Sequence, residues 1–177
     1  IGFQIGDEPE DEAALDVMLQ STTTIRGVDP DALLIVNFAD RDNTDSLLTK
    51  AAAHADVDVL SVDRYAYKDE QYAILESVRS HALAAGKPYW RYTDTYTQNG
   101  DPSPSEEDMR WDAMVGLVYG FTGLTWFIYQ IDPSPDLAPE LFTENGSFGA
   151  TKTSRYPIAA AINQEVRNLG RTLTQLT

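Results

Sequence analysis

The sequence contains no cysteine and only two histidines, His54 and His81. Without cysteine, neither a disulfide framework nor a thiolate metal site can form. The two histidines fall in separate helix-like segments, away from any third ligand at a recognisable spacing, which argues against a metal site built on imidazole. We therefore expect no metal and no other cofactor.

Long apolar runs and basic clusters are also missing. No apolar stretch reaches the roughly 20 residues that a membrane helix needs. The formal net charge of −15 repels nucleic acid and anionic membranes, because both require a positive surface. We expect neither as a partner. Ile1 is not a methionine, so any signal peptide would lie upstream of it; the location is open, with secretion favoured.

Acidic residues dominate the charge, with 28 Asp and Glu against 13 Lys and Arg. Hydrophobic residues still make up 42% of the chain, which is enough for a folded core. Among the bases, nine are arginine and four are lysine. An acidic, lysine-poor surface indicates a halophilic protein, whose self-repulsion is screened by salt. An ordinary acidic protein is the alternative.

Short apolar segments alternate with amphipathic ones along the whole chain. Gly86 and Pro88 are typical of a helix end, and Ser103-Pro104-Ser105 is typical of a helix start. Asn145-Gly146 predicts a hairpin turn within 142–152. The expected strands are 1–5, 32–38, 57–62, 88–93 and 123–129, and the expected helices begin near 10 and cover 42–55, 69–85, about 105–119 and 155–169.

This alternation predicts an α/β fold with a parallel sheet and right-handed crossovers. The strands are almost continuously apolar, as expected for strands covered on both faces. A doubly wound nucleotide-binding sheet requires a glycine-rich phosphate turn after its first strand. Here Gly6-Asp7-Glu8-Pro9 follows instead, and its carboxylates would repel phosphate. The barrel is therefore favoured over the doubly wound sheet.

Carboxylates, amides and aromatic rings follow the predicted strands. In a barrel, the carboxyl ends of the strands share one rim, where catalysis is placed. Carboxylates and amides suit sugar hydroxyls, aromatic rings suit sugar faces, and glycoside cleavage requires two carboxyl groups. The residues expected at this rim are Asp7, Glu8, Asn37, Asp40, Asp63, Tyr65, Tyr67, Asp94, Tyr96, Trp126 and Gln130.

Each of these residues also has a plainer interpretation. Asp7 and Glu8 could form the acidic first turn of the next helix, where the helix dipole favours them. Asp63 and Asp94 could be helix N-caps. Tyr65, Tyr67 and Trp126 could be core aromatics. The joint occurrence at four or five strand ends is what favours a site.

Several blocks of the chain resemble glycoside-hydrolase-like TIM barrels, similar to the β-galactosidases of glycoside hydrolase family 42 and their clan A relatives. The blocks are IGFQIGDEP, DVLSVDRYAY, ILESVRSHALAAGKPYWRYTDTY, PSEEDMRWDAMVGLVYGFTGLTWFIYQ and LFTENGSFGATKTSRYPIAAAINQEVRNLG. The resemblance implies the C-terminal half, strands four to eight, of a (β/α)8 TIM barrel. Residues 1–177 would then be one half-barrel domain of a longer chain, paired with an N-terminal half-barrel or with a second half-barrel in a homo-oligomer.

The resemblance also implies a glycosidase with a carbohydrate substrate. Glu8 matches the acid/base position after strand four, where clan A enzymes carry Asn-Glu and this chain has Asp7-Glu8. Clan A enzymes place a nucleophilic Glu after strand seven, where this chain has Thr93-Asp94. The expected catalytic residues are thus Glu8 and Asp94, with Asp63 as the second choice of nucleophile. The expected substrate-binding residues are Asp7, Asn37, Tyr65, Tyr67, Tyr96, Trp126 and Gln130.

Two alternatives stay open. The first is a carbohydrate-binding barrel without catalysis, which the Asp at position 94 favours because it is one methylene shorter than Glu. The second is a metal-dependent enzyme with Asp7, Glu8, Asp63 and Asp94 as oxygen ligands, since carboxylates suit Mg²⁺ or Ca²⁺.

Overall fold

The computed structural model describes residues 1–65, 71–95, 104–129, 141–143 and 151–175. The chain divides into two compact units, each of which is described by itself. Unit 1 comprises Ile1–Arg91 with Phe121–Gly123, and unit 2 comprises Tyr92–Gly120 with Leu124–Thr177. No helix in the described part of the chain combines the length and apolarity needed to span a membrane.

The predicted alternation of strands and helices is confirmed, and the fold is mixed α/β. One sheet has five strands in the order β1-β2-β3-β4-β5. The pairs β1–β2, β2–β3 and β3–β4 are parallel. The elements that begin in unit 1 are β1 (Gly2–Asp7), α1 (Glu12–Val28), β2 (Leu33–Ala39), α2 (Thr44–Ala53), β3 (Val59–Asp63), α3 (Tyr72–Ala85) and β4 (Tyr89–Asp94).

Local signals fix the helix ends in unit 1. The Asp11 carboxylate accepts a hydrogen bond from the Ala14 amide at 2.8 Å and so caps α1. Gly86 ends α3 in the left-handed conformation, with φ 66°, as its position before Lys87-Pro88 predicts. The helices therefore begin and end close to their predicted bounds.

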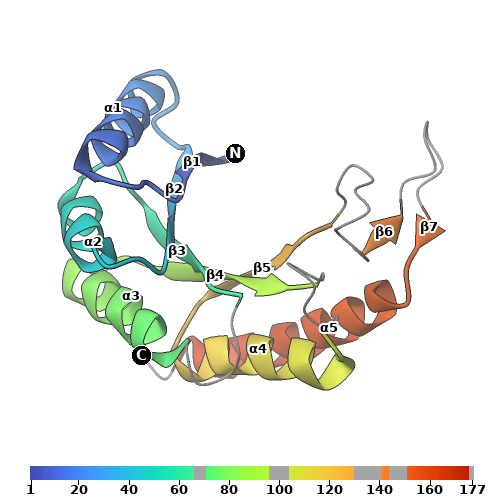
Figure 1. The fold of residues 1–177 in the computed structure, drawn as a ribbon. Helices are drawn as coiled ribbons and strands as arrows, with labels where there is room; N and C mark the ends of the chain where they lie inside the picture. Colours follow the sequence, from blue (N-terminus) through green and yellow to red (C-terminus); the bar gives the residue numbers. More distant parts are fainter. Residues whose placement is uncertain (66–70, 96–103, 130–140, 144–150, 176–177) are drawn as a thin grey trace. The chain divides into compact units, whose positions relative to one another are not determined.

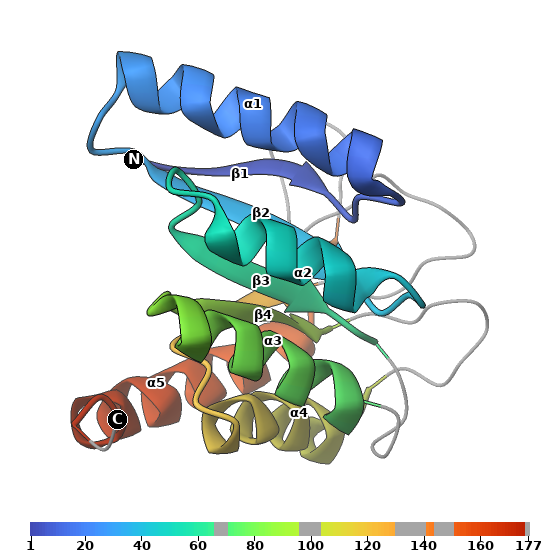
Figure 2. The same ribbon diagram turned by 90° about the vertical axis from the view of Figure 1, so that its left-hand side faces the viewer.

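The core of unit 1 lies between its sheet and helices α1, α2 and α3, which cover the same face of the sheet (Figures 1 and 2). In β2, Leu34, Val36 and Phe38 are fully buried, and Leu34 belongs to a cluster that also contacts α1. Because successive strand residues point to opposite faces, Ile35 and Asn37 point to the face that these helices leave uncovered.

The prediction of a buried first strand is wrong. Ile5 is the buried residue of β1, whereas Gly2, Phe3 and Gln4 are exposed. The apolar run was interpreted as a strand covered on both sides. Instead β1 stands at the end of the strand order and pairs with β2 alone among the described strands.

Unit 2 contains the end of β4, helix α4 (Glu106–Val118), strand β5 (Gly123–Phe127) from Leu124 onward, and helix α5 (Arg155–Leu173). Ser105 and Asp108 form a capping box at the start of α4. The short strands β6 (Phe142–Thr143) and β7 (Thr151–Lys152) are antiparallel, as the predicted hairpin requires, but its Asn145-Gly146 turn lies outside the described residues. The buried core of this unit consists of Met109, Ala113, Leu141, Ala159 and Ile162.

Candidate active site

Three neighbouring strands of unit 1 carry polar side chains to one edge of the sheet. Asp7 ends β1, Asp63 ends β3, and Asn37 lies in β2 between them. In the register, Asp7 pairs with Asn37 and Ala39 pairs with Asp63. Because β2 alternates between its two faces, these residues share the face that α1, α2 and α3 do not cover.

Asn37 joins the two aspartates. Its Nδ2 donates to Asp7 Oδ1 at 2.8 Å and to Asp63 Oδ1 at 2.7 Å. Gln4 Nε2 also donates to Asp7 Oδ1, at 3.0 Å. Asn37 is only 2% exposed, so its buried side chain holds Asp7 and Asp63 on either side of its amide.

A left-handed turn after β1 directs Glu8 toward the same place. Gly6 has φ 81° and Glu8 has φ 44°, and the β1–β2 register shifts between Gln4 and Asp7. A Cβ on Gly6 would lie 2.7 Å from Met18 Cε, so only glycine fits there. The Glu8 amide donates to the Asn37 carbonyl at 3.1 Å, which anchors a conformation that is rare outside glycine.

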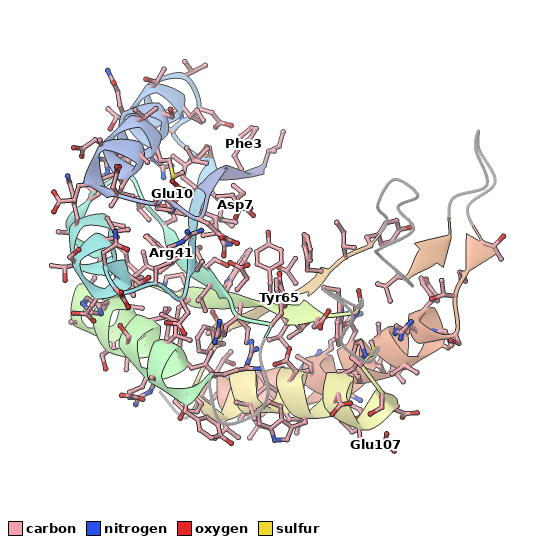
Figure 3. The ribbon with its side chains drawn as sticks, in the orientation of Figure 1. Phe3, Asp7, Glu10, Arg41, Tyr65 and Glu107 are labelled. Carbon is pink, nitrogen blue, oxygen red and sulfur yellow. The ribbon has the colours of Figure 1, made fainter. Side chains whose placement is uncertain are left out.

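The Glu8 side chain has two partners. Arg41 Nη2 donates to Glu8 Oε2 at 2.7 Å in a half-exposed ion pair. The Glu8 carboxyl also lies near Asp63 and raises the pKa of that residue. Figure 3 shows Asp7, Arg41 and Tyr65 at this group of strand ends. Glu8 therefore lies between a guanidinium and a second acid.

The pKa of Asp63 is raised from 3.8 to about 7. Burial is the largest cause, followed by the hydrogen bond with Glu8 and the negative charge of Glu8, and the charge of Asp7 adds to them. The hydrogen bond from Asn37 acts in the opposite direction because it favours the ionised form. A carboxyl with a pKa near neutrality can both give and take a proton at physiological pH.

Two charged residues that flank the site, Asp40 and Arg64, form an ion pair with each other. Arg64 Nε lies 3.4 Å from Asp40 Oδ2, which forms an ion pair beside the site. Tyr65 follows Arg64 and is half-buried. The predicted rim residues of unit 1 that the structure brings together are thus Asp7, Glu8, Asn37 and Asp63.

Asp94 has different surroundings, within unit 2. Its amide donates to Asp112 Oδ2 at 3.3 Å. Burial lowers the pKa of Arg155, and the negative charge of Asp94 opposes that effect. Trp126 donates from Nε1 to Asn163 Oδ1 at 2.8 Å. Asp94 thus has both a buried cation, Arg155, and a second buried acid, Asp112, among its neighbours.

The helix-cap interpretation of the two strand-end aspartates is wrong. The residue at the N-cap of α3 is Gln71 and that of α4 is Ser105, whereas Asp63 and Asp94 end strands. Likewise α1 begins at Glu12, so Asp7 and Glu8 do not belong to its first turn. These acids have no role in starting the helices that follow them.

Tyr67, Tyr96 and Gln130 lie outside the described residues. Within the described ranges, no group of three or more His, Cys, Asp or Glu is arranged to hold a metal ion.

Sequence reasoning missed several residues beside the predicted acids: Gln4, Arg41, Arg64, Asp112 and Arg155. Arg41 follows the second strand within two residues, so a search of the rim for bases as well as acids would have found it. Arg155 begins α5, and nothing in its sequence context connects it with Asp94.

Comparison with models of known protein families found no match. A search of curated proteins also found no relative.

Proposed function

We propose that this chain carries the proton-donating part of a glycoside hydrolase that acts on a glycosidic bond. The observation that carries the proposal is the group of acids at the strand ends, in which Asn37 joins Asp7 to Asp63, Arg41 holds Glu8, and the pKa of Asp63 is raised to about 7. A carboxyl with such a pKa can supply a proton at neutral pH, which the oxygen of a leaving sugar needs.

In this proposal Glu8 protonates the leaving oxygen and later activates water. The proposed nucleophile is Asp94, as the resemblance implies, and the buried cation Arg155 is its charged neighbour. Asp63 is the second choice.

The remaining rim residues bind the sugar. Asp7 is exposed and accepts hydrogen bonds only, so it suits a sugar hydroxyl. Tyr65 and Trp126 are half-buried and offer ring faces for stacking. The proposed substrate-binding residues are Asp7, Asn37, Tyr65 and Trp126, together with Tyr67, Tyr96 and Gln130 outside the described ranges.

The proposed architecture is the C-terminal half of a (β/α)8 barrel. The sequential order β1-β2-β3-β4-β5 supports it, because a doubly wound sheet reverses its strand order. The placement of α1, α2 and α3 on one face of unit 1 (Figure 1) supports it too, because helices cover both faces of a doubly wound sheet. The outer edge of β1 would pair with an N-terminal half-barrel or with a second copy.

A panel of chromogenic glycosides, offered to the full-length protein, tests the proposed function. We expect turnover of at least one sugar, lost in Glu8→Gln. Asp31→Asn is the matched control, because Asp31 is exposed and lies two residues before β2, away from the carboxyl ends of the strands. Absence of turnover across the panel would contradict the proposal.

The second candidate is a carbohydrate-binding barrel without catalysis. It is favoured by Asp94, which stands where the similar enzymes carry the longer Glu. In that case oligosaccharide binding would persist without hydrolysis, and Glu8→Gln would leave the affinity unchanged.

A further inference from the structure

We infer that His81 is the centre of a pH-dependent clamp between α2 and α3, which forms when its imidazole ring is protonated. The clamp consists of Asp45 and Thr49 on α2 with Ser77 and His81 on α3. The two helices lie side by side on the sheet of unit 1 (Figures 1 and 2). The inference goes beyond the proposed function, and its test needs no substrate.

Both ring nitrogens of His81 lie against oxygen atoms. Nδ1 is 2.9 Å from the carbonyl oxygen of Ser77, one turn earlier in α3. Nε2 is 3.0 Å from Thr49 Oγ1 on α2. Because a carbonyl oxygen only accepts hydrogen bonds, Nδ1 carries a hydrogen and donates. The charge of the ring therefore depends on whether Nε2 carries a hydrogen too.

The Thr49 hydroxyl decides the state of Nε2. It has one hydrogen, which it donates to the Asp45 carbonyl oxygen at 3.0 Å. Towards His81 the hydroxyl oxygen can then only accept, so Nε2 must donate. A ring with hydrogens on both nitrogens is the charged imidazolium. All of these hydrogen bonds are thus made together only when His81 is protonated.

The Asp45 carboxylate favours the same form of the ring. Its Oδ1 accepts a hydrogen bond from Ser77 Oγ at 2.9 Å and lies 3.8 Å from His81 Nε2. The Ser77 hydroxyl therefore holds the carboxylate beside the ring, although the Asp45 side chain is 77% exposed. A negative charge at this separation stabilises an imidazolium.

Other titratable groups near the clamp are occupied elsewhere. On α2, α3 and the strand β3 that packs against α3, they are Lys50, Asp63, Tyr72, Glu76 and Arg79. Lys50 pairs with two acids of α1, and Arg79 pairs with Glu76 at 3.1 Å. Tyr72 begins α3 and Asp63 ends β3. Within the described part of the chain, Asp45 is thus the charged partner of the ring.

His54, at the end of α2, has the opposite geometry. The Asp56 amide donates to His54 Nδ1 at 3.3 Å. A ring nitrogen that accepts a hydrogen bond carries no hydrogen, so this contact belongs to a neutral ring. The chain therefore contains one histidine whose contacts require the proton and one whose contacts exclude it, and His54 serves as the internal control.

Loss of the proton from His81 opens the clamp. The Thr49 hydrogen must then turn from the Asp45 carbonyl oxygen to Nε2, and the Asp45 carboxylate faces an uncharged ring. One hydrogen bond within α2 and the ion pair between the helices are lost. The clamp therefore stabilises the protein fully in acid, and its contribution disappears as the pH rises through about 6.5, where an imidazole usually releases its proton.

The test is a double-mutant cycle of Asp45→Asn and His81→Gln in the full-length protein, followed by thermal unfolding at pH 5 and pH 8. Both amides keep hydrogen-bonding atoms but carry no charge. At pH 5 the double variant should melt about 2 °C higher than the sum of the single losses predicts. At pH 8 the two losses should simply add. The raised pKa of Asp63 affects all four proteins alike and cancels in the cycle.

A second measurement reads the rings directly. In ¹⁵N-labelled wild type at about pH 6.5, NMR should show a larger protonated fraction for His81 than for His54. Asp45→Asn should lower that fraction at His81 and leave His54 unchanged.

Two outcomes would overturn the inference. A coupling of the same size at pH 5 and pH 8 would make the contact an ordinary hydrogen bond that needs no proton. A His81 ring no more protonated than that of His54 would show that the ring is neutral between the helices.

Discussion

The carboxyl groups at the ends of β3 and β4 have opposite environments. Asp63, in unit 1, lies near the acids Glu8 and Asp7, and its pKa is raised to about 7 by burial and by these acids. Asp94, in unit 2, has the buried cation Arg155 as a charged neighbour. The same residue type at the same kind of position thus has a raised pKa among other acids in one unit and a buried cation as its neighbour in the other.

Different neighbours let carboxyl groups of one residue type do different work at one pH. The raised pKa of Asp63 comes from burial and nearby acids, whereas Asp94 has a guanidinium as a charged neighbour. Changing one neighbour or one carboxyl at a time therefore tests the comparison.

The largest expected effect comes from Asp94, the proposed nucleophile. Asp94→Ala should lower glycoside turnover by at least about 10³-fold, as expected when a nucleophile is removed. Added azide should restore turnover and yield a glycosyl azide, because it can take the place of the carboxylate. Rescue without any azide product would mean that Asp94 is not the nucleophile.

The next effect concerns Glu8, the proposed proton donor. Glu8→Gln should lower kcat/KM for glycosides with poor leaving groups by about 10²–10⁴-fold. The melting temperature should hardly change, because the Glu8 side chain is 34% exposed and its ion pair with Arg41 is half-exposed. Unchanged turnover would remove Glu8 from the mechanism.

The third prediction compares the two faces of the sheet in unit 1. Leu34→Ala should destabilise the protein by about 3 kcal/mol, because Leu34 is fully buried against α1. Leu33→Ala is the matched control, since its neighbour Leu33 is only partly buried. Urea unfolding gives both values, and equal losses would contradict the assignment of a helix-covered face.

The fourth prediction concerns pH. Because the folded-state pKa of Asp63 is raised from 3.8 to about 7, its stabilising contribution is complete below about pH 4. That contribution is lost as the pH rises through 7. Between pH 5 and pH 8 the wild type should lose about 1 kcal/mol more than Asp63→Asn, a value reduced for the solvent exposure of the site. Parallel pH dependences in urea unfolding would show that Asp63 is not perturbed.

The smallest effect is that of salt on the acidic surface. Glu10, Asp11, Asp42 and Glu107 are exposed, and Figure 3 shows Glu107 pointing outward from α4. Screening shortens their repulsion from about 10 Å at 0.1 M salt to about 3 Å at 1 M. The melting temperature should rise by about 3 °C over that range. A flat or falling value would leave an ordinary acidic surface.

The order of strands and helices could be predicted from the sequence because their signals are local. Ser105 and Gly86 mark helix ends by their own chemistry, and each strand is a short apolar run. The exposure of β1 could not be predicted, because Ile1–Ile5 has the same composition whether one side or both sides of the strand are covered.

For the candidate site, the sequence pointed to acids at strand ends but not to their contacts. Asp7, Asn37 and Asp63 meet because the parallel register aligns their strands, and the βα alternation indicates that arrangement. The Arg41–Glu8 ion pair and the Glu8–Asp63 contact depend on the left-handed φ of Glu8. Glutamate rarely adopts a left-handed φ, so nothing in the sequence predicts this conformation at Glu8.

The open edge of β1 has a consequence for how this chain behaves on its own in solution. Phe3 is 39% exposed in β1 and Ile1, just before it, is 91% exposed. Among the described strands β1 pairs with β2 alone, and such an edge is a template for adding strands from other molecules. The net charge of −15 keeps copies of the chain apart at low salt. Salt that strengthens each folded molecule would therefore also remove the barrier to aggregation, so solubility and thermal stability should change in opposite directions as salt is added.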